Sequence, residues 1–337
     1  MILIMKNYLF IFTISISFSQ WFSLEHNGAN RTYYVSSPES LNPGLIIDMH
    51  GYGMTADQEY QYTDMDYYAH QENLMVVYPQ GLNNAWNVGT YWDSSSADDI
   101  GFISLMIDDI ISNFNINPNR IYACGLSNGG YMAYELACEL ADRITAFGSV
   151  TGNFMLNGNQ ECNNDREIPI IHFHGTNDNV VNYYPPSFDG SLTAEQSIEY
   201  WSEYNNLTVE TTEFIQGPLG STTEVQIYSS ELSDVQFVHY KVYGGGHEWF
   251  GTGFDWGFHS SEKIVEFFLQ YQLSDFMGEN QQSGDLNNDG IINIQDIILI
   301  IELILIGSNE YTESADLNHD GNIDVLDAIE IVNIILN

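Results

Sequence analysis

The chain has 337 residues, of which 44% are hydrophobic, enough for one large core and a small additional module. Only 7 lysine and arginine residues stand against 46 aspartate and glutamate residues, so the formal net charge is −39. A field of that sign repels nucleic acids and anionic membranes, which excludes both as partners.

Residues 1–19 are predicted to be a secretory signal peptide. A lysine precedes an apolar run at residues 8–18, which is too short to span a membrane, and Ser17 and Ser19 place small residues at the cleavage positions. We therefore expect a secreted protein, either free or attached to a cell surface or scaffold.

An early apolar strand is predicted at residues 45–50. It runs into the turn Gly51-Tyr52-Gly53, where the backbone amide of Tyr52 is a candidate donor to a substrate oxygen. His50, the last residue of the strand, is interpreted as a structural histidine.

Residues 121–130 carry the strongest functional signal. A short apolar strand runs into Gly125-Leu126-Ser127-Asn128-Gly129, and a helical pattern follows. This is a G-x-S-x-G turn, in which glycines allow a sharp strand-to-helix bend that presents the serine hydroxyl at the carboxyl end of a sheet. Amides at the start of the helix can face a developing oxyanion, so Asn128 N–H is one candidate donor.

Three cysteines in an exported chain allow one disulfide and leave one thiol. Cys124 lies in the strand before the G-x-S-x-G turn and is expected to be buried and free. Cys138, late in the following helix, and Cys162, in the next loop, remain to pair, and the sequence leaves that pairing open.

Two later segments provide the partners that a nucleophilic serine needs. The apolar strand at residues 168–174 ends in a loop that contains Asp178, and the strand at 235–242 opens into a glycine-rich loop that contains His247. Serine, then acid, then histidine is the chain order of the triad in an α/β-hydrolase. In that arrangement His247 takes the proton of Ser127, while Asp178 orients the imidazole and stabilises its charged form. The loop after the third strand of this fold supplies the second oxyanion amide, here that of Tyr52.

The region between Asp178 and His247 is longer than a minimal hydrolase requires. Residues 192–206 are predicted to form an amphipathic helix. Residues 208–227 alternate weakly between apolar and polar side chains, which is typical of strands. This region could line a substrate cleft together with three tryptophans, Trp86, Trp92 and Trp249. Tryptophans stack on sugar or aryl rings but are equally typical of a core, so both interpretations stay open.

The motifs together resemble a known family. They are Tyr78-Pro-Gln-Gly81, Leu126-Ser-Asn-Gly-Gly130, His174-Gly-Thr-Asn-Asp178 and Gly244-Gly-Gly-His-Glu-Trp249. They are similar to motifs of the secreted esterases of carbohydrate esterase family one, which are grouped with poly(3-hydroxybutyrate) depolymerases and feruloyl esterases. The resemblance runs from about residue 27 to about residue 271. It implies that Ser127 is the nucleophile, Asp178 the acid and His247 the base, with no cofactor for catalysis. One departure is Phe250, where the family has proline.

The C-terminal segment contains two copies of the calcium-loop pattern D-x-N-x-D-G. Oxygen-bearing side chains fall at loop positions 1, 3, 5, 9 and 12, and position 7 contributes a backbone carbonyl. The predicted ligands are Asp285, Asn287, Asp289, Ile291, Asn293 and Asp296 in the first loop, and Asp316, Asn318, Asp320, Asn322, Asp324 and Asp327 in the second. Two structural calcium ions are expected.

Residues 284–337 resemble a type I dockerin, preceded by a polar linker at 276–283. The resemblance implies a cohesin-type scaffold protein as partner. Its contact positions are here Ile294-Gln295 and Val325-Leu326 instead of the hydroxyl pairs of well-known dockerins, so the specificity stays open. A purely structural or cell-surface role for this module is the alternative.

The predicted architecture is an α/β-hydrolase domain at residues 20–275, with a mostly parallel sheet and helices on both faces, followed by a small all-α calcium-binding dockerin domain. The predicted function is that of a secreted serine esterase acting on feruloyl or acetyl esters of plant or algal polysaccharide. The first alternative is a polyhydroxybutyrate-type polyester depolymerase. An alternative of another class is a non-catalytic protein that binds glycans and docks to a scaffold.

Overall fold

The computed structural model describes residues 18–38, 42–89, 96–155, 162, 166–187, 190–276, 284–287, 291–306, 313–318 and 322–336. The predicted signal peptide lies outside these residues except for Phe18 and Ser19, which begin the first strand. Most of the predicted linker also lies outside them, so both assignments stay predictions.

One sheet dominates the larger module, and among the described residues it has ten strands in the order β1-β2-β4-β3-β5-β6-β7-β10-β9-β8. The strands are β1 (Phe18–His26), β2 (Ala29–Ser37), β3 (Gly44–Met49), β4 (Leu74–Pro79), β5 (Ile121–Leu126), β6 (Ala146–Val150), β7 (Ile170–Gly175), β8 (Val209–Gln216), β9 (Thr222–Ser229) and β10 (Phe237–Val242). The six central strands, from β4 to β10 in that order, pair in parallel, and antiparallel hairpins extend both edges.

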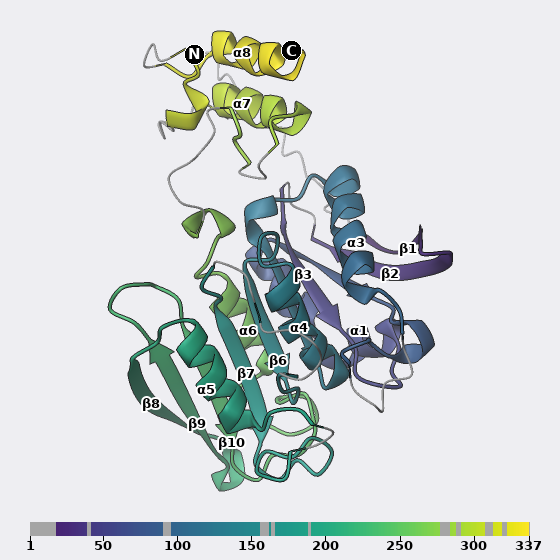
Figure 1. Ribbon diagram of the computed structural model, residues 1–337, viewed down its shortest axis with the longest axis vertical. Helices are drawn as coiled ribbons and strands as arrows, with labels where there is room; N and C mark the ends of the chain where they lie inside the picture. Colours follow the sequence, from purple (N-terminus) through teal and green to yellow (C-terminus); the bar gives the residue numbers. More distant parts are fainter. Residues whose placement is uncertain are drawn as a thin grey trace, which may run out of the picture.

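Helices cover both faces of this sheet (Figure 1). They are α1 (Ala56–Thr63), α2 (Met65–Ala69), α3 (Asp99–Phe114), α4 (Asn128–Glu139), α5 (Ala194–Tyr204) and α6 (Ser260–Phe268). One hydrophobic cluster joins alternate sheet residues to α3, α4 and α5, and a second joins the other sheet residues to α1, α2 and α6. Because both faces are covered, β3, β4, β5 and β7 are buried along their whole length, which explains their continuous apolar sequences.

The predicted elements match this arrangement closely. The four strands that carry the motifs are β3, β5, β7 and β10, and the helix expected at residues 192–206 is α5. The weak alternation at residues 208–227 belongs to the edge hairpin β8–β9. Since the carboxyl ends of parallel strands lie at one edge of a sheet, the loops after β3, β5, β7 and β10 open on the same side of the molecule.

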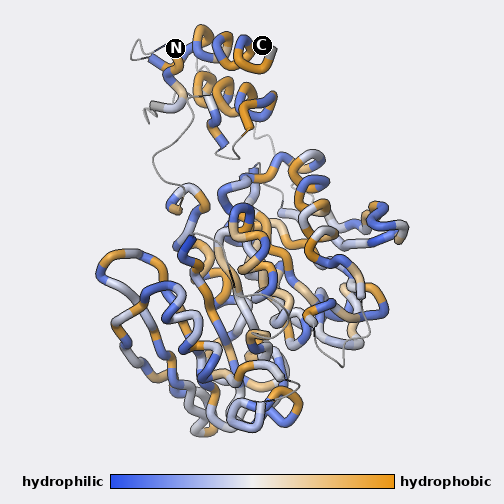
Figure 2. The backbone as a smooth tube through the Cα atoms, in the orientation of Figure 1, coloured by the Kyte–Doolittle hydropathy of each residue, from blue (hydrophilic) through white to orange (hydrophobic). Residues whose placement is uncertain are grey.

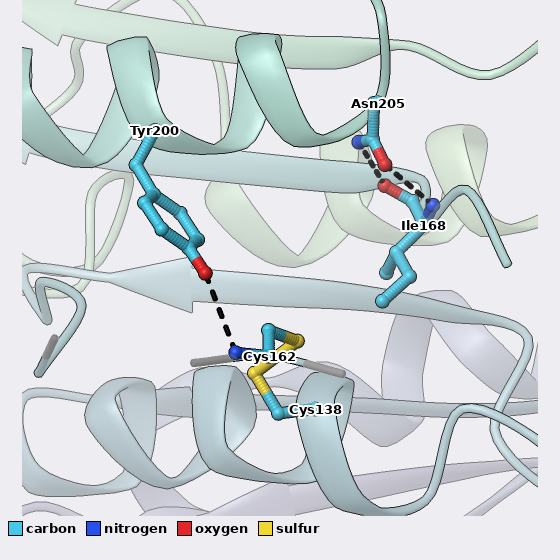
Figure 3. Close-up of a disulfide and its surroundings, with 5 residues drawn as sticks. All are labelled: Cys138, Cys162, Ile168, Tyr200 and Asn205. Atoms are coloured by element: carbon cyan, nitrogen blue, oxygen red, sulfur yellow. Dashed lines mark hydrogen bonds between the residues drawn. A yellow bond between two sulfur atoms is a disulfide. The ribbon is translucent and has the colours of Figure 1, made fainter. Parts of the chain in front are cut away.

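A disulfide between Cys138 and Cys162 joins the end of α4 to the segment that leads into β7, with a Cα–Cα distance of 4.8 Å (Figure 3). The same segment is held by Asn205, whose side chain donates to the carbonyl of Ile168 at 2.7 Å and accepts from its N–H at 2.8 Å. The pairing left open by the sequence is therefore present, and Cys124 is the buried free cysteine expected.

The C-terminal module consists of α7 (Ile294–Ile306) and α8 (Val325–Leu336), which lie side by side at one end of the molecule (Figure 1). Ile300, Ala328 and Ile331 form its small core. Both helices are rich in hydrophobic residues (Figure 2), and several of these face solvent. The module contacts the larger one where Asn119 Nδ2 donates to the carbonyl of Asn287 at 3.0 Å. Among the described residues, no helix combines the length and apolar character that a membrane crossing needs.

Two carboxyl groups are buried together beneath the loop that follows β3. Asp48 on β3 accepts a hydrogen bond from the Thr63 hydroxyl at 2.9 Å, and Glu59 on α1 is fully buried beside it. Burial raises the pKa of Asp48 from 3.8 to about 7. Burial, together with the charge of Asp48, raises the pKa of Glu59 well above its usual value. Folding therefore takes up protons at this site near neutral pH.

We expect the free energy of unfolding to fall as pH rises from about 4 to about 7, because only the unfolded state loses these protons readily. Urea unfolding at pH 5 and pH 8 measures the effect, and Asp48→Asn should flatten the pH dependence. Asp57→Asn, on the exposed face of α1, is the control and should leave it unchanged. Equal pH slopes in wild type and Asp48→Asn would show that Asp48 is ionised in the folded protein.

Candidate active site

Ser127 occupies the sharp turn between β5 and α4. Its backbone has φ 52° and ψ −114°, a region that residues with side chains rarely adopt. The turn is held by Ser127 N–H, which donates to the carbonyl of Val150 at 2.8 Å, and by close backbone packing. A Cβ at Gly129 would lie 1.9 Å from the Met49 carbonyl oxygen, so this position of the G-x-S-x-G motif requires glycine. The local sequence therefore produces a strained elbow at the carboxyl edge of the sheet.

Asp178 and His247 form a close pair at the same edge. Asp178 Oδ2 lies 2.7 Å from His247 Nδ1, while Asp178 Oδ1 accepts from the N–H groups of Val180 and Val181, both at 2.8 Å. Because a carboxylate only accepts, the proton of neutral His247 is on Nδ1, and Nε2 is left as the basic atom. Burial alone would raise the pKa of Asp178, but hydrogen bonds from His174 and His247 outweigh it and hold that pKa well below its usual range.

The loops that carry the acid and the histidine are bonded to each other. Asn177 N–H donates to the carbonyl of Gly245 at 2.9 Å, and Gly244 N–H donates to the Thr176 hydroxyl at 2.9 Å. The first bond continues the backbone pairing of β7 and β10 beyond the strands, and the second adds a side-chain link between the two loops. The distance between Asp178 and His247 is therefore set by the sheet itself.

A second histidine, His174, contacts the acid. His174 is fully buried, and its Nε2 lies 2.9 Å from the Val181 carbonyl and 3.4 Å from Asp178 Oδ2. Since a carbonyl only accepts, Nε2 carries a proton that also faces the carboxylate. In the sequence, the spacing of four residues between His174 and Asp178 was the feature that could have indicated this contact.

The loop after β3 borders the nucleophile. A Cβ on Gly51 would lie 3.6 Å from Ser127 Cβ, so the peptide that joins Gly51 to Tyr52 lies beside the serine. Asn128, the first residue of α4, is fully buried, and its side chain bonds the backbone N–H and carbonyl of Trp86 at 2.7 and 3.1 Å. Its amide side chain is thus committed to the fold, and the oxyanion role of the backbone amides of Tyr52 and Asn128 stays a prediction.

Two of the three tryptophans named as candidate substrate-binding residues are core residues, so of the two interpretations left open the core one holds for them. Trp86 and Trp249 are fully buried. Their indole N–H groups donate to the His50 carbonyl and the Ser261 hydroxyl, both at 2.9 Å. A ring with neither face open to solvent cannot stack on a sugar or an aryl group. Trp92 lies outside the described residues.

The predicted calcium loops contain buried carboxylates that hold the loop backbone. Asp296 is fully buried and accepts from the N–H groups of Leu286 at 2.7 Å and Asn293 at 2.8 Å. Asp327, its counterpart, accepts from Asn318 N–H at 3.2 Å and Asp324 N–H at 2.9 Å.

The remaining predicted ligands are described only in part, so the two calcium sites stay a prediction. Asp285 and Asp316, at position 1 of each loop, are also buried, whereas Asp289 and Asp320 lie outside the described residues. Residues 284–337 contain no lysine or arginine, so no such side chain of this module can pair with these buried carboxyl groups. An all-oxygen donor set suits calcium.

Comparison with known proteins agrees with both modules. Residues 283–336 match the dockerin type I domain, a domain that generally binds calcium, and residues 30–214, more than half of the chain, match the Phospholipase/Carboxylesterase family. The chain is 32% identical over 158 residues to a bifunctional acetylxylan esterase/xylanase of Neocallimastix patriciarum, which covers 46% of this chain and 22% of that protein. It is 29% identical over 220 residues to feruloyl esterase B of Piromyces equi, which covers 60% of this chain and 39% of that protein.

A solved structure with a similar fold is the acetyl xylan esterase from Aspergillus awamori, with a TM-score of 0.54 and 17% identity over 74% of this chain and 98% of that one. The mostly parallel sheet with helices on both faces is thus the α/β-hydrolase fold expected from the sequence. The chain belongs to the Phospholipase/Carboxylesterase family of α/β-hydrolases.

Proposed function

We propose that this protein is a secreted serine esterase that hydrolyses feruloyl or acetyl esters attached to plant or algal polysaccharide. The observation that carries the proposal is the Asp178–His247 pair at 2.7 Å, on the same sheet edge as a strained serine elbow. Such a combination of nucleophile, base and orienting acid is the arrangement of acyl transfer.

In the proposed mechanism, Ser127 Oγ attacks the ester carbonyl while His247 Nε2 takes the hydroxyl proton. The carboxylate of Asp178 stabilises the imidazolium, and its low pKa keeps it charged throughout the working pH range. The N–H groups of Tyr52 and Asn128 donate to the oxyanion. His247 then protonates the leaving alcohol, and a water molecule, deprotonated by the same nitrogen, releases the acid from Ser127. No cofactor takes part.

We propose polysaccharide esters as the substrates for two reasons. Both relatives described above carry names of esterases acting on acetylxylan or feruloyl esters. The dockerin domain supports attachment to a scaffold, where enzymes that act on cell-wall material are concentrated. Tyr52 and Val180, each about half exposed on the loops of the site, provide apolar contact surface for an acyl group.

The substrate is tested by measuring release of ferulate and acetate from arabinoxylan against release of 3-hydroxybutyrate from amorphous polymer. We expect methyl ferulate to exceed tributyrin and polyhydroxybutyrate in kcat/KM. Faster depolymerisation of the polyester would favour the alternative function. Absence of turnover on every ester, including p-nitrophenyl acetate, would favour a glycan-binding and scaffold-docking protein.

The C-terminal module is proposed to bind two calcium ions and to dock onto a cohesin-type scaffold protein. The exposed apolar side chains Ile294, Val325 and Leu326 occupy the predicted contact positions, and they are 68%, 62% and 51% exposed. Apolar surface of this kind on a small soluble module is typical of a protein interface. A purely structural role remains the alternative, and pull-down with a cohesin panel in calcium and in EGTA separates the two.

We expect the second calcium loop to bind more tightly than the first. It offers four carboxylates, because Asp324 stands at position 9, where the first loop has Asn293. Affinity in such loops follows ligand charge and rigidity. Calorimetric titration should show two unequal sites, and Asp324→Asn should reduce the difference between them.

Chelation should remove the helical signal of α7 and α8, because without metal the clustered carboxylates repel one another. Turnover of soluble esters should survive, since the triad lies in the other module. A C-terminal module that keeps its helices in EGTA, or a first loop that binds calcium more tightly than the second, would contradict the charge argument.

A further inference from the structure

His50, at the end of β3, is fully buried and has a defined tautomer. Its Nε2 accepts from Gly81 N–H at 3.0 Å and lies 3.2 Å from Gln80 Nε2. The orientation of the Gln80 amide is fixed, because its Oε1 accepts from Ala56 N–H at 3.0 Å. Both neighbours of His50 Nε2 are therefore donors, so the ring proton is on Nδ1. That atom lies 2.9 Å from the carbonyl oxygen of Gly51 and donates to it.

The ring is neutral in the folded protein. Burial lowers the pKa of His50 to about 4, and its polar contacts are with Gln80, Gly81 and Gly51, none of which titrates. A neutral ring with one proton cannot donate at both nitrogens. Because Gln80 and Gly81 both donate to Nε2, the single ring proton is on Nδ1, and Nδ1 therefore donates to the Gly51 carbonyl.

The Gly51 carbonyl belongs to the same planar peptide as the Tyr52 N–H, the amide proposed for the oxyanion. In a trans peptide these two groups point in opposite directions. The carbonyl is held by His50 Nδ1–H and by Met54 N–H at 3.1 Å, so the direction of the amide is held as well. The peptide borders the nucleophile, since a Cβ on Gly51 would lie 3.6 Å from Ser127 Cβ.

The same network reaches the second oxyanion amide. The indole of Trp86 donates to the carbonyl of His50 at 2.9 Å, and the backbone of Trp86 is bonded in both directions by the Asn128 side chain. The loop after β3 and the start of α4 are thereby fixed to one another through one buried tryptophan.

We propose that His50 is a positioning residue that, through the donors of Gln80 and Gly81, fixes the Tyr52 amide in the oxyanion site. This inference rests on the proposed function and gives the Tyr78-Pro-Gln-Gly81 motif a role in it. The motif orients a histidine, and the histidine orients a peptide.

Two variants of the full-length protein separate the two nitrogens. His50→Asn places an amide N–H near the position of Nδ1 and keeps the donor to Gly51. His50→Gln places an amide oxygen near the position of Nε2 and keeps the acceptor for Gly81, but it loses the donor. We expect His50→Gln to lower kcat/KM for p-nitrophenyl acetate by roughly 10- to 100-fold. The loss should be smaller than for complete removal of an oxyanion donor, because the Tyr52 amide is still present but less well oriented. The Ki of a trifluoromethyl ketone, whose adduct carries the oxyanion, should rise by a similar factor.

His50→Asn should stay within about fivefold of wild type in both measurements, because it keeps the donor to the Gly51 carbonyl that His50→Gln loses. His70→Gln is the matched control, since the ring of His70 contacts Ser36, and it should behave as wild type. Wild-type kcat/KM and Ki in His50→Gln, or equal losses in the Asn and Gln variants, would overturn the proposal.

The tautomer can be tested without any variant. Long-range ¹H–¹⁵N spectra of the wild type should show His50 as a neutral ring with its proton on Nδ1 between pH 5 and 8, and a proton on Nε2 would overturn the proposal. Failure of the proposed function gives a different result, in which the wild type neither hydrolyses esters nor binds the ketone.

Discussion

Ser127→Ala is expected to lower kcat for p-nitrophenyl acetate by roughly a million-fold, and His247→Ala by a similar factor, because nucleophile and base act as one unit. Without the hydroxyl no acyl-enzyme can form, and without the imidazole nothing removes the serine proton. The residual rate should come from binding and the oxyanion amides alone. Steady-state kinetics on purified variants, with circular dichroism to confirm folding, makes the measurement.

Ser112→Ala is the control for the first variant, because this serine lies on α3 and its hydroxyl donates to the Asp108 carbonyl in the preceding helical turn. It should retain wild-type turnover. A folded Ser127→Ala or His247→Ala protein that keeps more than a tenth of wild-type activity would rule out the assignment of that residue.

Asp178→Asn is expected to reduce kcat by about 10⁴-fold. The amide preserves the size of the side chain, so the loop should keep its shape. It removes the charge that stabilises the imidazolium, and an amide N–H facing His247 Nδ1 would favour the wrong tautomer. The measurement is again kcat, supported by the pH profile. Asp142→Asn, at an exposed position before β6, serves as the control. A loss smaller than tenfold would show that another group orients His247, and His174 is the residue to examine next.

The motif-bearing strands and the order of the site residues could be predicted because both are local properties. A buried parallel strand is a short apolar run, and a strand-to-helix elbow needs glycines at fixed places, as the contact of Gly129 with Met49 shows. Asp178 and His247 each follow such a strand, and parallel pairing of β7 and β10 then brings them together. Their proximity thus follows from their places after two strands that become neighbours in the sheet.

The roles of the tryptophans and of His50 could not be predicted, since they depend on contacts between distant segments. Burial of Trp86 follows from its bonds to His50 and Asn128, and nothing in its own sequence neighbourhood distinguishes a core indole from a stacking platform. The tautomer of His50 depends on Gly81, a residue in the loop that follows the neighbouring strand β4. Whether Cys138 and Cys162 form a disulfide was likewise open until the fold placed them beside each other.

Covalent labelling tests the central claim most directly. A fluorophosphonate reacts with a serine that is activated by a neighbouring base, and peptide mass spectrometry locates the modified residue. The account predicts stoichiometric labelling at Ser127 in the wild-type protein, with strongly slowed labelling in His247→Ala. Labelling of a different serine, or no labelling of folded wild-type protein, would contradict it.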